Sequence, residues 1–250
     1  MTARTLPITA RIRGRDVSRD EVLTWEAKRA EKVARRLGIA AAGADAQTLS
    51  RRIVDRKLEL GHDRIERLVK RDVRVSGLVS RFGAAVSRGH RAVATTVLTC
   101  PTGRAEHLPE WYSEHFAAND ERLMLAASPD HWLFRARTDG RDEVCEVAAA
   151  SPFVIQMFFD DSDISTVRTP TDTSFPVDLA AIARTDNGTP IGGIRHLFRD
   201  ETDGFRVQLN VEFPVIMLPY AITWHCWHLA SEFSNWIEFA NEIRDPAATP

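Results

Sequence analysis

The first part of the chain carries apolar positions at helical spacing. Between Ser18 and Gly38 the apolar residues form one stripe with a period of about 3.6, and most Lys and Arg residues lie off it. Ser18 and Glu21 have the spacing of a capping box, and Gly38 is a typical residue beyond a helix C-terminus. Two more helices are expected, of which one ends before Gly61 and the other begins after it. The pattern therefore predicts an all-helical N-terminal segment.

Near residue 90 the helical stripes give way to short β-branched and apolar runs. The clearest run, residues 205–213, alternates apolar and polar positions strictly, which is typical of a half-buried antiparallel strand. Asp139-Gly140 separates two other runs and is a hairpin signal. Residues 105–127 predict one helix, or two with a break near Asn119, and residues 221–243 predict a long terminal helix. The expected strands are 92–100, 131–138, 142–148, 153–159, 177–185, 191–199 and 205–213.

The order of these elements resembles a known fold. Over residues 92–243 it is strand, helical segment, six strands and a long helix, and the stretch GGIRHLFRDETDGFRVQLNVEFP leads into that helix. This is similar to the helix-grip fold of the START and polyketide-cyclase superfamily. The resemblance implies a cavity between sheet and helix that holds a small, mostly apolar molecule. It leaves the activity open, because such domains include carriers, cyclases, hydrolases and ligand sensors.

The predicted fold class is therefore α+β, with two parts. Residues 1–90 form a basic helical N-terminal segment. Residues 91–250 form a ligand-binding domain in which a curved antiparallel sheet grips the C-terminal helix.

The terminal helix carries polar residues inside its apolar face. At 100° per residue, a single strip contains His225, His228, Glu232, Asn235 and Trp236. The opposite side, which we expect to face water, contains Trp227, Ser231, Ser234 and Glu238. If the strip closes the cavity, two imidazoles, a carboxylate and an amide point into it beside an indole.

Several roles fit this strip. His225, His228 and Glu232 are candidate acid–base residues for a cyclisation, dehydration or hydrolysis, because burial and proximity shift their pKa values in opposing directions. With Asn235 and Trp236 they also suit the polar end of an otherwise apolar ligand. A structural polar network without a site is a further alternative.

A metal site is the remaining alternative for His225, His228 and Glu232. Two imidazoles and a carboxylate are reasonable ligands for Zn or Fe. However, His225 and Glu232 lie about 10 Å apart along the helix axis, so one ion does not easily reach both. The sequence therefore assigns neither a metal nor a cofactor, and a metal-dependent enzyme stays an alternative.

Two histidines on predicted strands receive different interpretations. His196 shares a strand face with Ile194 and Phe198, so it is a ligand-binding candidate, or a core histidine bonded to a backbone carbonyl. His131 shares a face with Arg135, so we expect it to be exposed.

Composition narrows the class of protein. With 44% hydrophobic and 27% charged residues, the chain has ordinary soluble composition, and no apolar run is long enough for a membrane span. There is no apolar segment typical of a secretory signal, and the three cysteines form no CxxC pair. We therefore expect a cytoplasmic protein. The motifs GxGxxG, HExxH and GxSxG and a P-loop are missing from the sequence, so nucleotide, zincin and α/β-hydrolase classes have no support.

The charge is unevenly distributed. Residues 1–91 hold 22 Lys and Arg against 11 Asp and Glu, whereas the remainder holds 11 against 24. The basic helices suggest a ligand-responsive or nucleic-acid-binding regulator as a rival function. Acidic residues are interleaved with the basic ones and aromatic residues are few, which favours solvated helix faces attracted to the acidic remainder.

Overall fold

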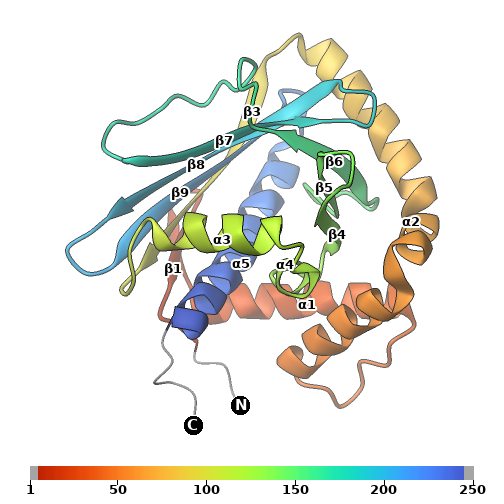
Figure 1. Ribbon diagram of the computed structural model, residues 1–250, viewed down its shortest axis with the longest axis horizontal. Coiled ribbons are helices and arrows are strands. Elements are labelled where there is room, and N and C mark those ends of the chain that lie inside the picture. The colour runs from red at the N-terminus through yellow and green to blue at the C-terminus, as the bar shows by residue number, and fades with distance from the viewer. Residues whose placement is uncertain (1–4, 245–250) are drawn as a thin grey trace.

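One antiparallel sheet contains the nine strands found in the computed structural model, which describes residues 5–244 (Figure 1). The sheet is curved and unclosed, with β2 and β4 at its edges and the order β2-β1-β3-β9-β8-β7-β6-β5-β4. The strands are β1 (Thr9–Ile12), β2 (Arg15–Ser18), β3 (Arg91–Cys100), β4 (His131–Ala136), β5 (Asp142–Glu146), β6 (Ile155–Asp160), β7 (Val177–Arg184), β8 (Pro190–Asp200) and β9 (Phe205–Pro214). The helices in the same range are α1 (Arg19–Leu37), α2 (Ala46–Ser87), α3 (His107–Ala117), α4 (Glu121–Ala126) and α5 (Pro219–Arg244).

The N-terminal segment is not entirely helical, so that part of the prediction is wrong. Strands β1 and β2 form a hairpin, and Ala10 of β1 lies opposite Leu98 of β3. Ala10 and Ile12 are buried and alternate with exposed neighbours, as a half-buried strand requires. Four residues are too few for such alternation to stand out in a sequence. The first elements therefore extend the same sheet as the later strands.

The predicted helix boundaries are mostly confirmed. Ser18 caps α1 in a capping box with Glu21, and Gly38 ends the helix at φ 70°. The two helices expected on either side of Gly61 are both present. They meet at a kink where Gly61 has the non-helical angles φ 66° and ψ 168°, and together they carry the label α2. The break predicted near Asn119 separates α3 from α4. Asn119 has a φ of 54°, which lies in the left-handed region that asparagine tolerates.

Two apolar cores hold these elements together. The larger core lies between the sheet, α5 and α3, and includes Leu98, Leu209 and Ile237. The second lies between α1, α2 and the β4–β5 hairpin, and includes Ile53 and Trp132. Each side of the hairpin therefore faces a different core.

Helix α5 is buried on nearly every side, so the expectation that Ser231 and Ser234 face water is wrong. Both are almost completely buried. Helix α1 packs along this side of α5, and Arg19 of α1 forms an ion pair with Glu238 at 2.7 Å. A helical wheel gives the angle of each residue but not which neighbour covers it. Away from its two ends, α5 consequently places its polar groups against protein or toward the cavity described below.

None of the helices within residues 5–244 combines the length and apolar character that crossing a bilayer requires.

Candidate functional site

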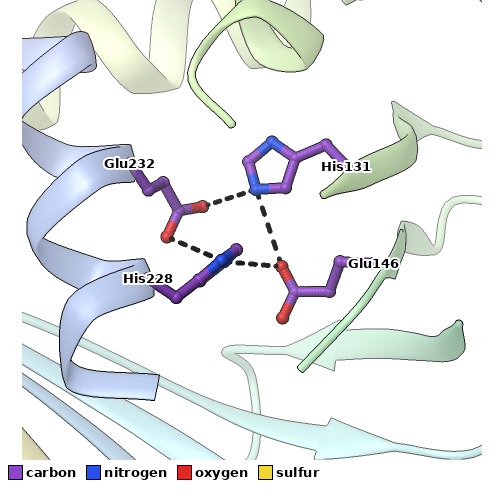
Figure 2. Close-up of side chains that lie close together, drawn as sticks. All are labelled: His131, Glu146, His228 and Glu232. Carbon is purple, nitrogen blue, oxygen red and sulfur yellow. Dashed lines mark ion pairs between the residues drawn. The ribbon is translucent and has the colours of Figure 1, made fainter. Parts of the chain in front are cut away.

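Four buried titratable side chains meet between the β4–β5 hairpin and α5 (Figure 2). They are His131 from β4, Glu146 from β5, and His228 and Glu232 from α5. One nitrogen or oxygen atom from each lies within 4.8 Å of those from the other three. We call this group the His/Glu cluster.

Each histidine of the cluster faces both carboxylates. His131 Nε2 lies 3.0 Å from Glu232 Oε1 and 3.6 Å from Glu146 Oε2. His228 Nε2 lies 3.3 Å from Glu146 Oε2 and 3.8 Å from Glu232 Oε2. Neither Nε2 atom makes a well-aligned hydrogen bond with a residue that the structure describes. The four groups therefore converge on a common point rather than forming discrete hydrogen-bonded pairs.

A β-bulge turns His131 toward this point. His131 lies opposite Glu146, whereas Leu133 lies opposite Cys145, so the register shifts between them. The extra residue reverses the alternation of the strand. His131 consequently packs against Phe134, with ring centroids 5.0 Å apart, and is completely buried. The expectation that it is exposed is wrong, because that expectation assumed an unbroken period of two.

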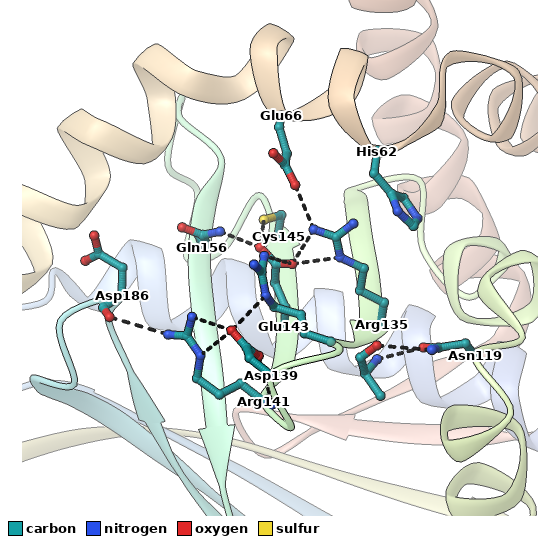
Figure 3. Close-up of polar contacts among 12 residues, drawn as sticks. His62, Glu66, Asn119, Arg135, Asp139, Arg141, Glu143, Cys145, Gln156 and Asp186 are labelled. Carbon is teal, nitrogen blue, oxygen red and sulfur yellow. Dashed lines mark hydrogen bonds and ion pairs between the residues drawn. The ribbon is translucent and has the colours of Figure 1, made fainter.

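Polar contacts connect the other face of the hairpin to its neighbours (Figure 3). Arg135 points away from the His/Glu cluster, where it bonds to Glu143 at 2.8 Å and to Glu66 of α2 at 2.7 Å. Gln156 of β6 also donates to Glu143. These contacts tie the hairpin to α2 and hold the face that carries His131 and Glu146 toward α5.

Two basic residues of the N-terminal helices fix the backbone around His131. Lys57 of α2 donates to the carbonyls of Pro129 and His131, and Arg29 of α1 makes two hydrogen bonds to Asp130, at 2.9 and 2.7 Å. Burial lowers the pKa of Lys57 to about 7, although Asp130 opposes the shift. The N-terminal helices therefore position one member of the cluster.

The hydrogen bond made by Nδ1 of His131 determines the tautomer of its ring. His131 Nδ1 lies 2.8 Å from the carbonyl oxygen of Met124. Because a carbonyl only accepts, Nδ1 carries the hydrogen and donates it. In the neutral ring the lone pair then lies on Nε2, which faces Glu232 and Glu146.

The cluster has strong internal electrostatics. Burial opposes ionisation of Glu146, but the positive charge of His228 outweighs it and lowers the pKa of Glu146 to about 2. Burial likewise opposes the charge on His228, but Glu146 and then Glu232 raise the pKa of His228 to about 9. Two buried carboxylates therefore attract positive charge to this point.

The carboxylates of the cluster also line a large cavity. The cavity has a volume of about 840 Å³ and lies between the sheet, α5, α3 and the C-terminal half of α2. Its wall is mainly apolar, with Met157, Leu179 and Phe198 among its residues. Glu146 and Glu232 reach this wall, while the completely buried His131 and His228 lie behind them. A volume of this size matches that of small-molecule sites.

Two further histidines line the cavity as neutral groups. Burial lowers the pKa of His196 and that of His225 to about 3. The Nδ1 atom of each has no hydrogen-bond partner within the described part of the chain. His196 packs against Phe233 and His225 against Phe213, both with ring centroids 4.9 Å apart. Near neutral pH these rings present both a donor and an acceptor.

The structure separates the residues that the sequence grouped together. His225, Glu232, Trp236 and His196 line the cavity, and His228 lies behind its wall in the His/Glu cluster. Asn235 points away from the cavity and bonds to Glu26 of α1 at 2.9 Å. The set His225, His228 and Glu232 does not converge as one metal-ligand group; His131 and Glu146 join His228 and Glu232 instead.

Sequence reasoning did not identify His131 and Glu146 as site residues. Each lies at the end of a short strand, where a polar residue is ordinarily exposed. The hairpin that contains both residues was predicted from Asp139-Gly140. Because residues paired across a hairpin lie close together, this pairing was the signal that could have linked them. The bulge and the approach of α5 were not visible in the sequence.

No protein-family model matches the chain, and no curated protein matches it.

A buried carboxylate joins α1 to α5 beside the site. Glu26 Oε2 accepts hydrogen bonds from Ser231 Oγ at 2.7 Å and from Asn235 Nδ2 at 2.9 Å. Burial raises the pKa of Glu26, although these bonds and Arg19 oppose the shift. The folded state therefore holds this proton more tightly than the unfolded chain does.

Glu26→Gln tests this linkage. A raised folded pKa makes the wild type lose stability as pH rises from the unfolded pKa through the folded one, whereas glutamine carries no charge in either state. We expect the free energy of unfolding of the variant, relative to wild type, to be higher at pH 8 than at pH 4 in urea denaturation. Glu31→Gln, on the exposed face of α1, controls for the loss of one negative charge. A relative stability that falls with pH would contradict the prediction.

Proposed function

We propose that the protein binds a small hydrophobic or aromatic molecule in the cavity between the sheet and α5, with the sheet gripping the helix around it. The observation that carries this proposal is the cavity of about 840 Å³ with a mainly apolar wall. Removing apolar ligand surface from water contributes roughly 25 cal/mol per Å². The shape and chemistry of the wall therefore favour a molecule that is mostly hydrocarbon.

The polar groups of the wall favour a ligand with one polar end. Glu146, Glu232 and His225 lie near one another at one part of the cavity, and His196 contributes a second neutral ring. Such groups are costly to bury without partners, at about 1–3 kcal/mol each. A hydroxyl or carbonyl on the ligand satisfies them. We extend the proposal to acid–base chemistry on the bound ligand, carried out by the same polar groups.

An apolar rim offers a path into the cavity. The cavity is lined by Val79 of α2, by Ile216 and Leu218 between β9 and α5, and by Tyr220 in the first turn of α5. Each exposes more than half of its surface. Exposed apolar residues that gather in this way commonly mark a site of interaction. We assign this rim as the entrance for the ligand.

The rival function, a nucleic-acid-binding regulator, has less support. Three cations of the N-terminal helices are engaged inside the protein: Arg19 with Glu238, Arg29 with Asp130, and Lys57 with backbone carbonyls. These side chains position α5 and His131 rather than forming a free basic surface.

Blocking the cavity tests the proposal. Ala181 of β7 lines the cavity on the same strand face as Leu179. We expect wild type to bind the apolar fluorophore N-phenyl-1-naphthylamine saturably at one site. Ala181→Trp should lower its affinity at least about tenfold, because the indole occupies the ligand volume.

Ala85→Trp is the matched control, since Ala85 is exposed on α2 and does not line the cavity. It should leave binding unchanged. Equal loss in both variants, or non-saturable binding in wild type, counts against the proposal.

The polar end is tested at His196. In competition with the same fluorophore, His196→Leu should weaken binding of 1-naphthol roughly fivefold, because one hydrogen bond contributes about 1 kcal/mol. Naphthalene, which has no hydroxyl, should bind the variant as well as it binds wild type. If both competitors weaken to the same degree, His196 shapes the wall without recognising a polar group.

A further inference from the structure

We propose that His131, Glu146, His228 and Glu232 bind one divalent transition-metal ion of the Zn²⁺, Fe²⁺ or Mn²⁺ type. Imidazole nitrogens and carboxylate oxygens are the ligands that these ions share. The metal site goes beyond ligand binding in the cavity and does not depend on it.

The spacing of the four groups fits a single ion. Metal–ligand bonds of about 2.1 Å in a tetrahedron place neighbouring ligand atoms about 3.4 Å apart. The four nitrogen–oxygen distances in the His/Glu cluster, 3.0, 3.3, 3.6 and 3.8 Å, lie on both sides of this value. All four ligand atoms lie within 4.8 Å of one another, so the groups must draw closer together to coordinate an ion.

The orientation of His131 is that of a metal ligand. His131 Nδ1 donates to the carbonyl of Met124, which is the outer-shell contact that usually fixes a metal-binding histidine. Its Nε2 atom, and that of His228, point into the cluster from completely buried rings without an aligned hydrogen bond to a described residue. An ion at the centre supplies the missing partner for both nitrogens.

Charge balance supports the same conclusion. Glu146 and Glu232 bring two negative charges into the interior, and a divalent ion with two neutral imidazoles cancels them.

The ion would be reached from the cavity. Glu146 and Glu232 line the cavity wall and the two histidines lie behind them. With four protein ligands in place, a substrate oxygen would take a fifth position, which such ions can adopt. We therefore assign the substrate class as hydrophobic molecules whose polar end carries an oxygen ligand, and this step rests on the proposed function.

Metal analysis of tag-free protein tests the site. After removal of ions with a chelator, the wild type should take up about one Zn²⁺, Fe²⁺ or Mn²⁺ per chain, measured by elemental analysis after gel filtration. Co²⁺ should give the visible absorption of a low-coordinate site that saturates at one equivalent. Failure of the folded wild type to retain any of these ions stoichiometrically overturns the proposal, whatever the variants do.

Variants locate the ion. His228→Asn and Glu146→Gln should each lower the affinity for Zn²⁺ by more than the roughly 10–100-fold that loss of an outer-shell partner costs. His62→Asn is the matched control, because His62 faces Glu121 at 2.6 Å in a histidine–carboxylate pair outside the cluster. It should bind Zn²⁺ as wild type does. Stoichiometric binding that survives both cluster substitutions overturns the assignment.

A pair of probes tests access from the cavity. Octanohydroxamic acid carries a metal-binding group on an apolar tail, and octanamide has the same tail without it. Zn²⁺-loaded protein should prefer the hydroxamate at least about tenfold, and the preference should disappear in metal-free protein. Equal binding of both probes to Zn²⁺-loaded protein contradicts the inference that the ion is reached from the cavity, but it does not contradict the metal site itself. Binding of neither probe, with Zn²⁺ retained, counts against the proposed cavity function alone.

Discussion

The arrangement around the site depends on one constraint, which is that carboxylates buried side by side need compensating positive charge. Glu146 and Glu232 lie at the junction of the β4–β5 hairpin and α5, and His131 and His228 face them from the same two elements. The cost of burying an unpaired charge is several kcal/mol. The hairpin and the helix must therefore meet in one relative position, because a displacement of either would separate the charges.

The surrounding structure maintains that position through further buried pairs. Arg29 holds Asp130 next to His131, and Lys57 holds the backbone on both sides of it. On the far side of α5, Arg19 pairs with Glu238. The N-terminal helices thus do more than enclose a second core, since they fix both the strand and the helix that carry the His/Glu cluster. Three basic residues in the first third of the chain thus have their partners in the remainder, whereas others, such as Lys28 and Arg64, are exposed.

Local patterns in the sequence predict local structure well here. The Ser18–Glu21 capping box, the alternation along β9 and the hairpin signal at Asp139-Gly140 all correspond to observed elements, although Asn210 and Glu212 on the polar face of β9 are buried. The site was predicted less completely because it depends on two non-local features. The bulge after His131 reverses which residues of the strand face α5. Helix α1 covers the side of α5 that the helical wheel predicted to face water. The helical wheel gives the angular positions of the residues along α5 but not the elements that surround the helix. Asn235 therefore bonds to Glu26 of α1 rather than pointing into the cavity.

The position of the His/Glu cluster is itself an argument that it serves a purpose other than stability. Well-packed apolar residues of similar volume usually stabilise a core as much as a buried ionic group does, or more. Phe134 and Trp236, which pack around His131, show that this region accommodates large apolar side chains. Four ionisable groups nevertheless occupy it, and two of them reach the wall of an otherwise apolar cavity. A purely structural network gains nothing from that exposure, whereas a site that acts on the polar end of a hydrophobic molecule requires it.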